Sequence, residues 1–367
     1  MQCNAVSLVH FRNIERASVR FCPGVNVLFG NNAQGKTNLL EAIYFAAIGR
    51  SFRSLHPKEC IAFGEESAAI SLDFEAQGRV QNITMQLFQS RLRSVEKNHV
   101  RVARMSELMG AFRAVLFCPE QLSLVKGGPA ERRHFLDIAI SAREPAYLAA
   151  LQRYEHILKQ RNALIRAAEK DRSVFDATVE LWSQQLAREG AYIARSRKRY
   201  VEKAAPYMAA CFAEMTNDRE LPMLHYQGCD RAENPDYEDL AAIEAHLFER
   251  LCKNHEREIG AGATLYGVHK DDVEIILNER DARSFASQGQ QRSLSLALKL
   301  AEGELCREDC GEYPVFLLDD VLSELDGARR EYLLHRIKGK QVIMTTCEPV
   351  EGHADHLVFV QGGTFRE

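Results

Sequence analysis

The sequence predicts an α/β protein with a mostly parallel sheet and a second, mainly helical lobe. Short apolar stretches alternate with helical patterns near both ends of the chain, as in parallel strands joined by helices. Between about 130 and 210, apolar residues instead recur at helical spacing. At 367 residues the chain is long for one core, so we expect two lobes.

The elements can be assigned in order along the chain. A hairpin is expected over 67–90, turning at Gln77-Gly78-Arg79. The other expected strands are 6–14, 18–29 with a break at Pro23-Gly24, 273–278, 315–320 and 341–346. Expected helices are one that ends at Gly49, those of the region 130–210 with breaks near Pro145 and Asp171–Ser173, 288–305 and 328–337. We expect a loop over 215–237, and no heptad run is long enough for an extended coiled coil.

The composition narrows the class of protein. No apolar stretch approaches the roughly 20 residues of a membrane helix, and the start lacks the pattern of a signal peptide, so we expect a cytoplasmic protein. The ten cysteines form no CxxC pair and are expected to be free thiols. Net charge is −4, but 151–204 holds 12 basic against 7 acidic residues, which is compatible with a local basic face or a solvated helix.

A phosphate-binding loop is the strongest local signal. Residues 30–37, GNNAQGKT, fit G-x-x-x-x-G-K-[ST] between a strand and a helix. Glycines let backbone N–H groups turn toward phosphate oxygens, the helix start adds unpaired N–H groups, and Lys36 adds a full charge. The Thr37 hydroxyl is placed to bind Mg²⁺. The alternative is a glycine-rich turn without a ligand. The predicted nucleotide-binding residues here are Gly30, Asn31, Asn32, Ala33, Gln34, Gly35, Lys36, Thr37 and Asn38.

The stretch 315–320, VFLLDD, supplies the second half of such a site. It is an apolar strand that ends in two carboxylates, the Walker B pattern. Asp319 is expected to hold Mg²⁺, and Asp320 to orient or deprotonate the attacking water. Together with Lys36 as the other catalytic residue, the pattern predicts ATP and Mg²⁺ as cofactors.

Ser287-Gln288-Gly289-Gln290 opens the helix expected at 288–305 and resembles the signature motif of ABC-type ATPases. The alternative is a serine helix cap. The order of motifs favours the ABC class, because Ser323–Asp326 resembles its D-loop and Thr345-Thr346 takes the place of its switch residue. In that class the signature serine reaches the γ-phosphate bound to a second copy. Ser287, Gly289 and Gln290 are therefore added to the nucleotide site, and we expect ATP-dependent homodimerisation.

Longer stretches resemble the RecF family of recombination-repair ATPases, which are related to SMC heads. They are 8–53, 117–137, 266–278, 284–302 and 317–326. The resemblance implies an ABC/SMC-like head without long arms that binds ATP and DNA, dimerises with ATP, and hydrolyses it slowly under DNA stimulation. It also implies action with RecR and RecO to place RecA on gapped DNA. Gln121 and Val268-His269-Lys270 depart from the family pattern and bear on coupling or a partner contact.

The resemblance also divides the chain and directs the search for DNA contacts. We expect an ATPase lobe of 1–117 plus 306–367 and a helical lobe of 118–305 that carries the signature. Phosphate contacts need cations and carry no base code. The candidates, each of which could instead be an ordinary surface charge or ion pair, are Arg50, Arg53, Arg132, Arg133, Arg195, Arg197, Lys198 and Arg199.

Two other functions share parts of these motifs. A transporter's ATP-binding subunit has the phosphate loop and Walker B strand, but this signature lacks the usual Leu-Ser-Gly-Gly start and the helical insertion is long. A scaffold with a vestigial site is opposed by the intact Lys36, Thr37, Asp319 and Asp320.

Overall fold

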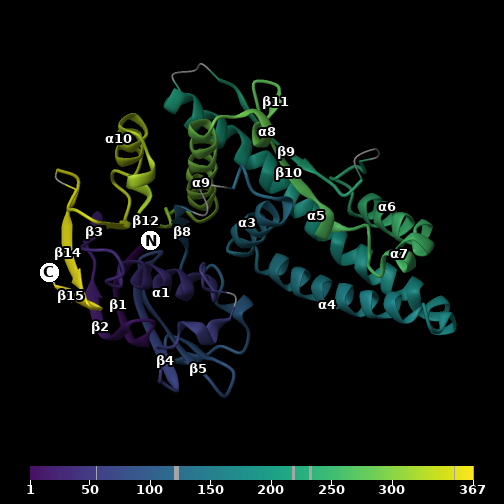
Figure 1. Ribbon diagram of the computed structural model, residues 1–367, viewed down its shortest axis with the longest axis horizontal. Coiled ribbons are helices and arrows are strands. Elements are labelled where there is room, and N and C mark those ends of the chain that lie inside the picture. Colours follow the sequence, from purple (N-terminus) through teal and green to yellow (C-terminus); the bar gives the residue numbers. More distant parts are fainter. Residues whose placement is uncertain (55, 120–123, 217–219, 231–233, 351, 367) are drawn as a thin grey trace. The chain divides into compact units, whose positions relative to one another are not determined.

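The computed structural model describes residues 1–54, 56–119, 124–216, 220–230, 234–350 and 352–366, shown in Figure 1. The chain divides into two compact units. Unit 1 comprises Met1–Ser123, Cys211–Arg219 and Arg292–Glu367, and unit 2 comprises Leu124–Ala210 and Glu220–Gln291. The division differs from the expected lobes mainly at 292–305, which belong to unit 1 because they pack with its core.

Unit 1 contains an antiparallel sheet of six strands. In spatial order they are β2 (Ile14–Arg20), β1 (Gln2–Phe11), β4 (Ser67–Ala76), β5 (Arg79–Phe88), β6 (Ser94–Lys97) and β7 (Val100–Arg101). The predicted hairpin over 67–90 is confirmed. Its turn residues Gln77 and Gly78 both have positive φ, 52° and 68°, which glycine adopts without strain.

A second six-stranded sheet in unit 1 carries the strands that lead to the site. In spatial order they are β15 (Thr364–Arg366), β14 (His356–Gln361), β3 (Val25–Phe29), β13 (Val342–Thr346), β12 (Val315–Asp319) and β8 (Ala114–Phe117). From β14 to β8 every pairing is parallel, as predicted. Every residue of β12 and β13 is buried, which explains their continuous apolar sequences.

Three of the helices that the sequence predicts accompany this sheet. They are α1 (Lys36–Ile48), α9 (Gln288–Cys310) and α10 (Gly327–Arg336). Helix α1 is buried along nearly its whole circumference, consistent with the apolar residues that its sequence places on every side. It ends at Gly49, whose φ of 74° forms a left-handed cap, as the sequence predicts.

Unit 2 is mainly helical. Its helices are α3 (Pro129–Ser141), α4 (Pro145–Ala167), α5 (Arg172–Thr216, which extends into unit 1), α6 (Leu240–Lys253), α7 (His255–Ala261) and α8 (Ala282–Phe285). The predicted breaks near Pro145 and Asp171–Ser173 are confirmed. None of the helices in the described ranges is both long and apolar enough to cross a bilayer.

A small antiparallel sheet completes unit 2. Its order is β11 (Arg280–Asp281), β10 (Asp272–Leu277) and β9 (Pro222–Gln227). The prediction of a loop over 215–237 is wrong at β9. Residues of β9 alternate between buried and exposed positions, but Pro222 and the neighbouring polar residues hide this short signal in the sequence.

Candidate nucleotide-binding site

The phosphate loop leaves strand β3 and enters helix α1 through a backbone path that only small residues permit. Gly30 and Gly35 have φ of 145° and 111°, and Ala33 has φ of 62°. A Cβ on Gly30 would lie 2.3 Å from the carbonyl oxygen of Val360. Both the left-handed backbone and the close approach of β14 therefore require glycine at position 30.

Lys36 begins helix α1 and folds back over the loop. Its ammonium donates hydrogen bonds to the carbonyl oxygens of Gly30, at 2.6 Å, and Asn31, at 2.8 Å. The helix has no side-chain cap at Gly35, so its first N–H groups keep their capacity to bind an anion. The loop thus combines a buried cation with a free helix N-terminus.

Thr37 joins the loop to the carboxylate end of strand β12. Its hydroxyl donates to Asp319 Oδ1 at 2.7 Å, and the Thr345 hydroxyl, from the end of β13, donates to the same oxygen at 2.8 Å. The Asp320 N–H in turn donates to Thr345 Oγ1 at 2.9 Å, and Asp320 adopts a left-handed φ of 51°. Parallel strands end at one edge of the sheet, so these side chains converge although they are far apart in sequence.

The C-terminal hairpin β14–β15 braces the loop from its outer side. The N–H of Gly363 donates to the Gln34 carbonyl at 2.8 Å, and the N–H of Gly362 donates to Gln34 Oε1 at 2.7 Å. These two glycines were not among the predicted site residues. The only sequence feature that could have indicated them is a Gly-Gly pair after an apolar strand.

A second set of contacts holds the beginning of α1. Asn38 Nδ2 donates to Asn13 Oδ1 at 2.7 Å, and Arg53 donates to Asn38 Oδ1 at 2.8 Å. The Asn38 side chain therefore binds protein groups on both sides. Asn13, which sequence reasoning missed, follows strand β1 in a turn that carries no motif.

Glu41, on the same helix, is fully buried and paired with a cation. Arg12 donates to it from Nε at 3.0 Å and from a terminal nitrogen at 2.6 Å, and the Ser51 hydroxyl donates at 2.5 Å. Burial lowers the pKa of Arg12, but the hydrogen bond and attraction of Glu41 outweigh it, and the net pKa is raised. Arg12 is therefore held as a cation against the helix that follows the phosphate loop.

The predicted signature residues form a capped helix start in unit 2. The Gln290 N–H donates to Ser287 Oγ at 3.2 Å, and the Ser287 N–H donates to Gln290 Oε1 at 2.7 Å. This is a reciprocal capping box at the beginning of α9. The serine cap considered from the sequence is thus present, and it orders the segment that would present Ser287 and Gly289 to a ligand.

The unit 1 residues suit a nucleoside triphosphate with Mg²⁺. Positive-φ glycines, an uncapped helix start and the Lys36 ammonium match the oxygens of a polyphosphate. The Thr37 hydroxyl and the Asp319 carboxylate, already in contact, are oxygen ligands of the type that Mg²⁺ prefers.

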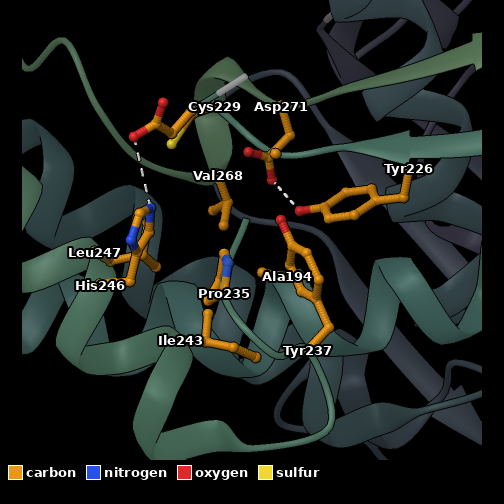
Figure 2. A pocket seen from close by; sticks show the side chains of 12 residues that line it. Ala194, Tyr226, Cys229, Pro235, Tyr237, Ile243, His246, Leu247, Val268 and Asp271 are labelled. Carbon is orange, nitrogen blue, oxygen red and sulfur yellow. Dashed lines mark hydrogen bonds and ion pairs between the residues drawn. The ribbon is translucent and has the colours of Figure 1, made fainter. Parts of the chain in front are cut away.

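Several predicted DNA-contacting residues of unit 2 are engaged inside the protein. Arg197 is 2% exposed and pairs with Asp137 at 2.8 Å and Asp271 at 3.3 Å, and Arg132 is 5% exposed and pairs with Asp272 at 2.7 Å. The predicted DNA contacts of these two arginines are therefore not supported. Figure 2 shows Asp271 where it also accepts a hydrogen bond from Tyr226.

The pocket in Figure 2 lies beside this network and is too small for a nucleotide. Its lining includes Asp271, Tyr226 and His246, and the volume of the pocket is about 20 Å³. That is room for about one water molecule, whereas ligand sites usually span about 300–1,000 Å³. We therefore assign the pocket to the packing of unit 2.

The other predicted DNA-contacting residues of unit 2 differ in how they are bound to protein groups. Arg133 donates to the carbonyl of Asp271 at 2.6 Å, Lys198 pairs with Glu202 at 3.0 Å and Arg199 with Glu238 at 2.8 Å. Arg195, in the same helix, is half-buried. Position 121, where the sequence departs from the RecF pattern, lies outside the described residues.

Arg50 and Arg53 follow helix α1 and are exposed at the surface of unit 1. Arg93 contacts Gly49, the residue before Arg50, and burial together with the positive charge of Arg50 lowers the pKa of Arg93. Arg93 is half-buried and donates a hydrogen bond to the Gly49 carbonyl, at the end of helix α1. Sequence reasoning missed Arg93 because it comes after strand β5, far from any motif.

The fold and site define the class of this protein. A phosphate loop between β3 and α1, with carboxylates at the end of β12, two strands from β3 in the same sheet, is the arrangement of a P-loop ATPase head of the ABC/SMC class. The Smc head domain from Pyrococcus furiosus shares the fold, with a TM-score of 0.58 at 17% identity over 99% of this chain and 95% of that one. The family model "RecF/RecN/SMC N terminal domain" matches residues 3–361.

Within this class, the chain belongs to the RecF family. The DNA replication and repair protein RecF of Bacillus velezensis is 38% identical, over 100% of this chain and 98% of its own. That of Limosilactobacillus reuteri is 40% identical, over 92% and 90%. The solved structure designated RecF-ATPrS, a recombination mediator protein of the RecFOR pathway, superposes with a TM-score of 0.93 at 32% identity, over 99% of this chain and 97% of that one. The structure designated RecF-ATP gives 0.92 at 32% identity, over 99% and 96%.

Proposed function

We propose that the protein is an ATP-dependent DNA-binding switch of recombinational repair that acts in the cytoplasm. The observation that carries the proposal is the convergence of Thr37, Asp319 and Thr345 beside the Lys36 loop. A vestigial site would have no reason to keep this oxygen cluster and its buried lysine together. The similarity to solved structures designated RecF-ATP and RecF-ATPrS gives independent support.

Each side chain of the site has a distinct role in this proposal. Lys36 exchanges its bonds with the Gly30 and Asn31 carbonyls for phosphate oxygens. Thr37 and Asp319 hold Mg²⁺, which neutralises charge on the phosphates when bound. Asp320, next along the chain, orients or deprotonates the attacking water.

ATP then joins two copies of the chain. Ser287, with Gly289 and Gln290 in the ordered start of α9, contacts the terminal phosphate held by the other copy. The nucleotide favours the closed dimer because it binds both copies only in that state. Hydrolysis removes the terminal phosphate and releases the dimer, so ATP sets the timing of binding and release.

DNA is the proposed partner of the exposed arginines on unit 1. Arg50 and Arg53 are exposed, and the half-buried Arg93 adds a third positive charge near Arg50. Such cations suit phosphates without reading bases. Arg53 also contacts Asn38, one residue beyond Thr37, so that DNA bound there is expected to stimulate slow ATP hydrolysis. In unit 2, Arg195, Lys198 and Arg199, together with Arg133, remain weaker candidates.

Further partners follow from the family. The similarity to RecF of the RecFOR pathway supports an assembly with RecR and RecO that places RecA on gapped DNA. Membrane coupling, the mark of the transporter alternative, has no counterpart in the described residues, where no helix is suited to span a bilayer.

The decisive experiment measures ATP hydrolysis and molecular mass with no DNA, single-stranded, duplex and gapped DNA. The mass should double with ATP in the hydrolysis-slow variant Asp320→Asn, and hydrolysis by the native chain should rise on gapped DNA. Lys36→Arg should remove the change in mass. A chain that binds no ATP would support the scaffold alternative. ATP binding without any response to DNA would exclude the repair switch.

A further inference from the structure

Two cysteines lie one turn apart at the end of helix α9, in the part of that helix that belongs to unit 1. The sulfur atoms of Cys306 and Cys310 are 4.0 Å apart. Residues four apart in an α-helix have Cα atoms about 6 Å apart, a separation that a disulfide can span. A small rotation of the two side chains is therefore enough to bring the sulfur atoms into bonding distance.

The two thiols have different environments. Cys306 is 6% exposed, whereas Cys310 is partly exposed. A hydrogen bond from the Cys306 thiol, and further the charge of Arg113, lower the pKa of Cys310, although partial burial acts in the opposite direction. The same hydrogen bond and burial raise the pKa of Cys306. Cys310 is therefore the thiol that more readily becomes a thiolate, which is the reactive form.

Both protonation states of Cys310 have partners in the protein. When protonated, its thiol donates to the carbonyl oxygens of Cys306, at 2.9 Å, and Glu312, at 3.3 Å. When the proton is lost, the Cys306 thiol and the Arg113 guanidinium donate hydrogen bonds to the sulfur. The thiolate can therefore form without a rearrangement of the helix end.

A polar pocket of about 260 Å³ lies beside Cys310 in unit 1. Its lining includes Arg113 and Glu312, both of which contact Cys310, together with Lys97 and Glu107. A small polar molecule needs only slightly more room than water, whose share of liquid volume is about 30 Å³. The pocket thus offers such a molecule a route toward the sulfur.

Packing alone explains Cys306 but not Cys310. Buried cysteines act as small apolar side chains and are inert, whereas reactive cysteines are partly exposed and lie beside positive charge. Cys310 meets both conditions, and a second thiol lies within reach of its sulfur. This is the arrangement of an attacking cysteine and a resolving cysteine.

We propose that Cys306 and Cys310 form a modification site, in which a hydroperoxide such as hydrogen peroxide oxidises Cys310 and Cys306 completes a reversible disulfide within α9. The inference goes beyond the proposed function, because neither cysteine belongs to the nucleotide-binding residues. In a reducing cytoplasm, disulfides of this kind are usually transient and redox-sensing.

The chemistry has two steps. The Cys310 thiolate attacks one peroxide oxygen, the O–O bond breaks and hydroxide leaves, so that the sulfur is oxidised to a sulfenic acid and the peroxide is reduced. The sulfur of Cys306 then attacks the sulfur of Cys310. An S–S bond forms, the S–O bond breaks, and the hydroxyl group leaves with the Cys306 proton as water.

The test treats the reduced native chain with hydrogen peroxide and maps its cysteines by peptide mass spectrometry. Trypsin cleaves after Arg307, which separates the two cysteines, so the disulfide is detected as a pair of linked peptides. We expect this pair in a chain that stays monomeric on a non-reducing gel, and dithiothreitol should remove it. Cys347 is the internal control, since it is exposed and its thiol donates to Asn32 Oδ1 at 3.2 Å. Cys310 should be oxidised at least about tenfold faster than Cys347, despite its lower exposure.

Two serine variants distinguish the roles of the thiols. In Cys306→Ser, the sulfenic acid of Cys310 has no resolving partner and should be trapped by dimedone. In Cys310→Ser, Cys306 should stay reduced over the same exposure. Neither change touches the nucleotide-binding residues, so both variants should bind ATP as the native chain does, which also shows that they are folded.

Arg113 is the proposed positioning residue of the site. In the Cys306→Ser background, Arg113→Gln should slow trapping by dimedone at least about threefold, because the thiolate loses a stabilising cation. Arg113→Lys keeps the charge and should restore most of the rate. Equal rates in all three chains would overturn the role of Arg113.

The native chain alone is sufficient to overturn the proposal. Oxidation of Cys347 before Cys310, linkage of Cys310 to another cysteine, or linked peptides found only in a covalent dimer would each contradict a disulfide within α9. Equal dimedone trapping at position 306 in Cys310→Ser and at position 310 in Cys306→Ser would contradict the assignment of Cys310 as the attacking thiol.

Discussion

At the scale of single residues, Thr345 shows how one hydroxyl organises the carboxylates of the site. It is 2% exposed, donates to Asp319 at 2.8 Å and accepts from the Asp320 N–H at 2.9 Å. It thereby positions the proposed metal ligand and the proposed catalytic carboxylate at once. In the sequence, the only indication of this role is the position of Thr345, which is where ABC proteins have a switch residue.

Replacing Thr345 by valine should weaken both the fold and nucleotide binding. The variant keeps the shape but leaves the Asp320 N–H without its acceptor, at a cost of about 1–3 kcal/mol in the free energy of unfolding. We expect affinity for Mg²⁺-ATP to fall roughly tenfold, the equivalent of one such bond. Urea denaturation and titration with a fluorescent ATP analogue would measure the two effects.

Thr345→Ser is the matched control, because it keeps the hydroxyl and removes only a methyl group. It should bind nucleotide nearly as the native chain does. If valine and serine variants were indistinguishable in both measurements, the hydroxyl would have no role in positioning the carboxylates.

At the scale of elements, helix α1 is attached to the turn between β1 and β2 by the pair of Arg12 and Glu41. The carboxylate is fully buried and Arg12 donates two hydrogen bonds to it. Without the Arg12 guanidinium, Glu41 would remain a buried charge beside the Ser51 hydroxyl and the more distant Arg53, at 3.7 Å. The pair therefore fixes the helix that presents the phosphate loop.

Arg12→Ala should destabilise unit 1 by about 3 kcal/mol, the typical cost of breaking a buried ion pair from one side. Thermal denaturation followed by circular dichroism would show a clearly lowered Tm. The double variant Arg12→Met/Glu41→Leu should be much milder, since it leaves no buried charge unpaired. Arg16→Ala, at an exposed position of β2, is the control for loss of a surface arginine.

If the double variant were as unstable as Arg12→Ala, the packing of the arginine stem would be the important contribution. That result would contradict the electrostatic explanation.

At the scale of the whole molecule, the candidate DNA-contacting arginines divide into those that are buried and those that are exposed. Arg132 and Arg197 are buried against carboxylates in unit 2, whereas Arg50 and Arg53 are exposed in unit 1. The net charge of −4 therefore does not reveal which arginines a partner could reach. DNA binding should depend on the second pair more than on the first.

The double variant Arg50→Glu/Arg53→Glu should weaken DNA binding and reduce its dependence on salt. For every phosphate that the variant no longer neutralises, the slope of log K against log salt should become shallower by about 0.9. Fluorescence anisotropy with duplex DNA at several salt concentrations would measure it. Lys198→Glu, on a surface helix, is a matched charge reversal that should leave the slope nearly unchanged, and an equal weakening there would place the DNA on unit 2.

The sequence by itself determined the class of site. Gly30, Gly35 and Lys36 act through local backbone geometry, so their spacing is enough to predict a phosphate loop. The buried strands β12 and β13 were equally visible, because a strand covered on both faces must be apolar throughout. The parallel sheet and the helical region followed from the same periodicities.

Only the tertiary structure decided which long-range partners each side chain meets. It brought Thr345 to Asp319 and Gly362 to Gln34, and it buried Arg197, which in sequence looks like any member of a basic run. Burial and ion pairing depend on segments that are distant along the chain, and no local pattern records them. Strand β9 was missed for the same reason, since its pairing with β10 outweighs the weak preferences of its own residues.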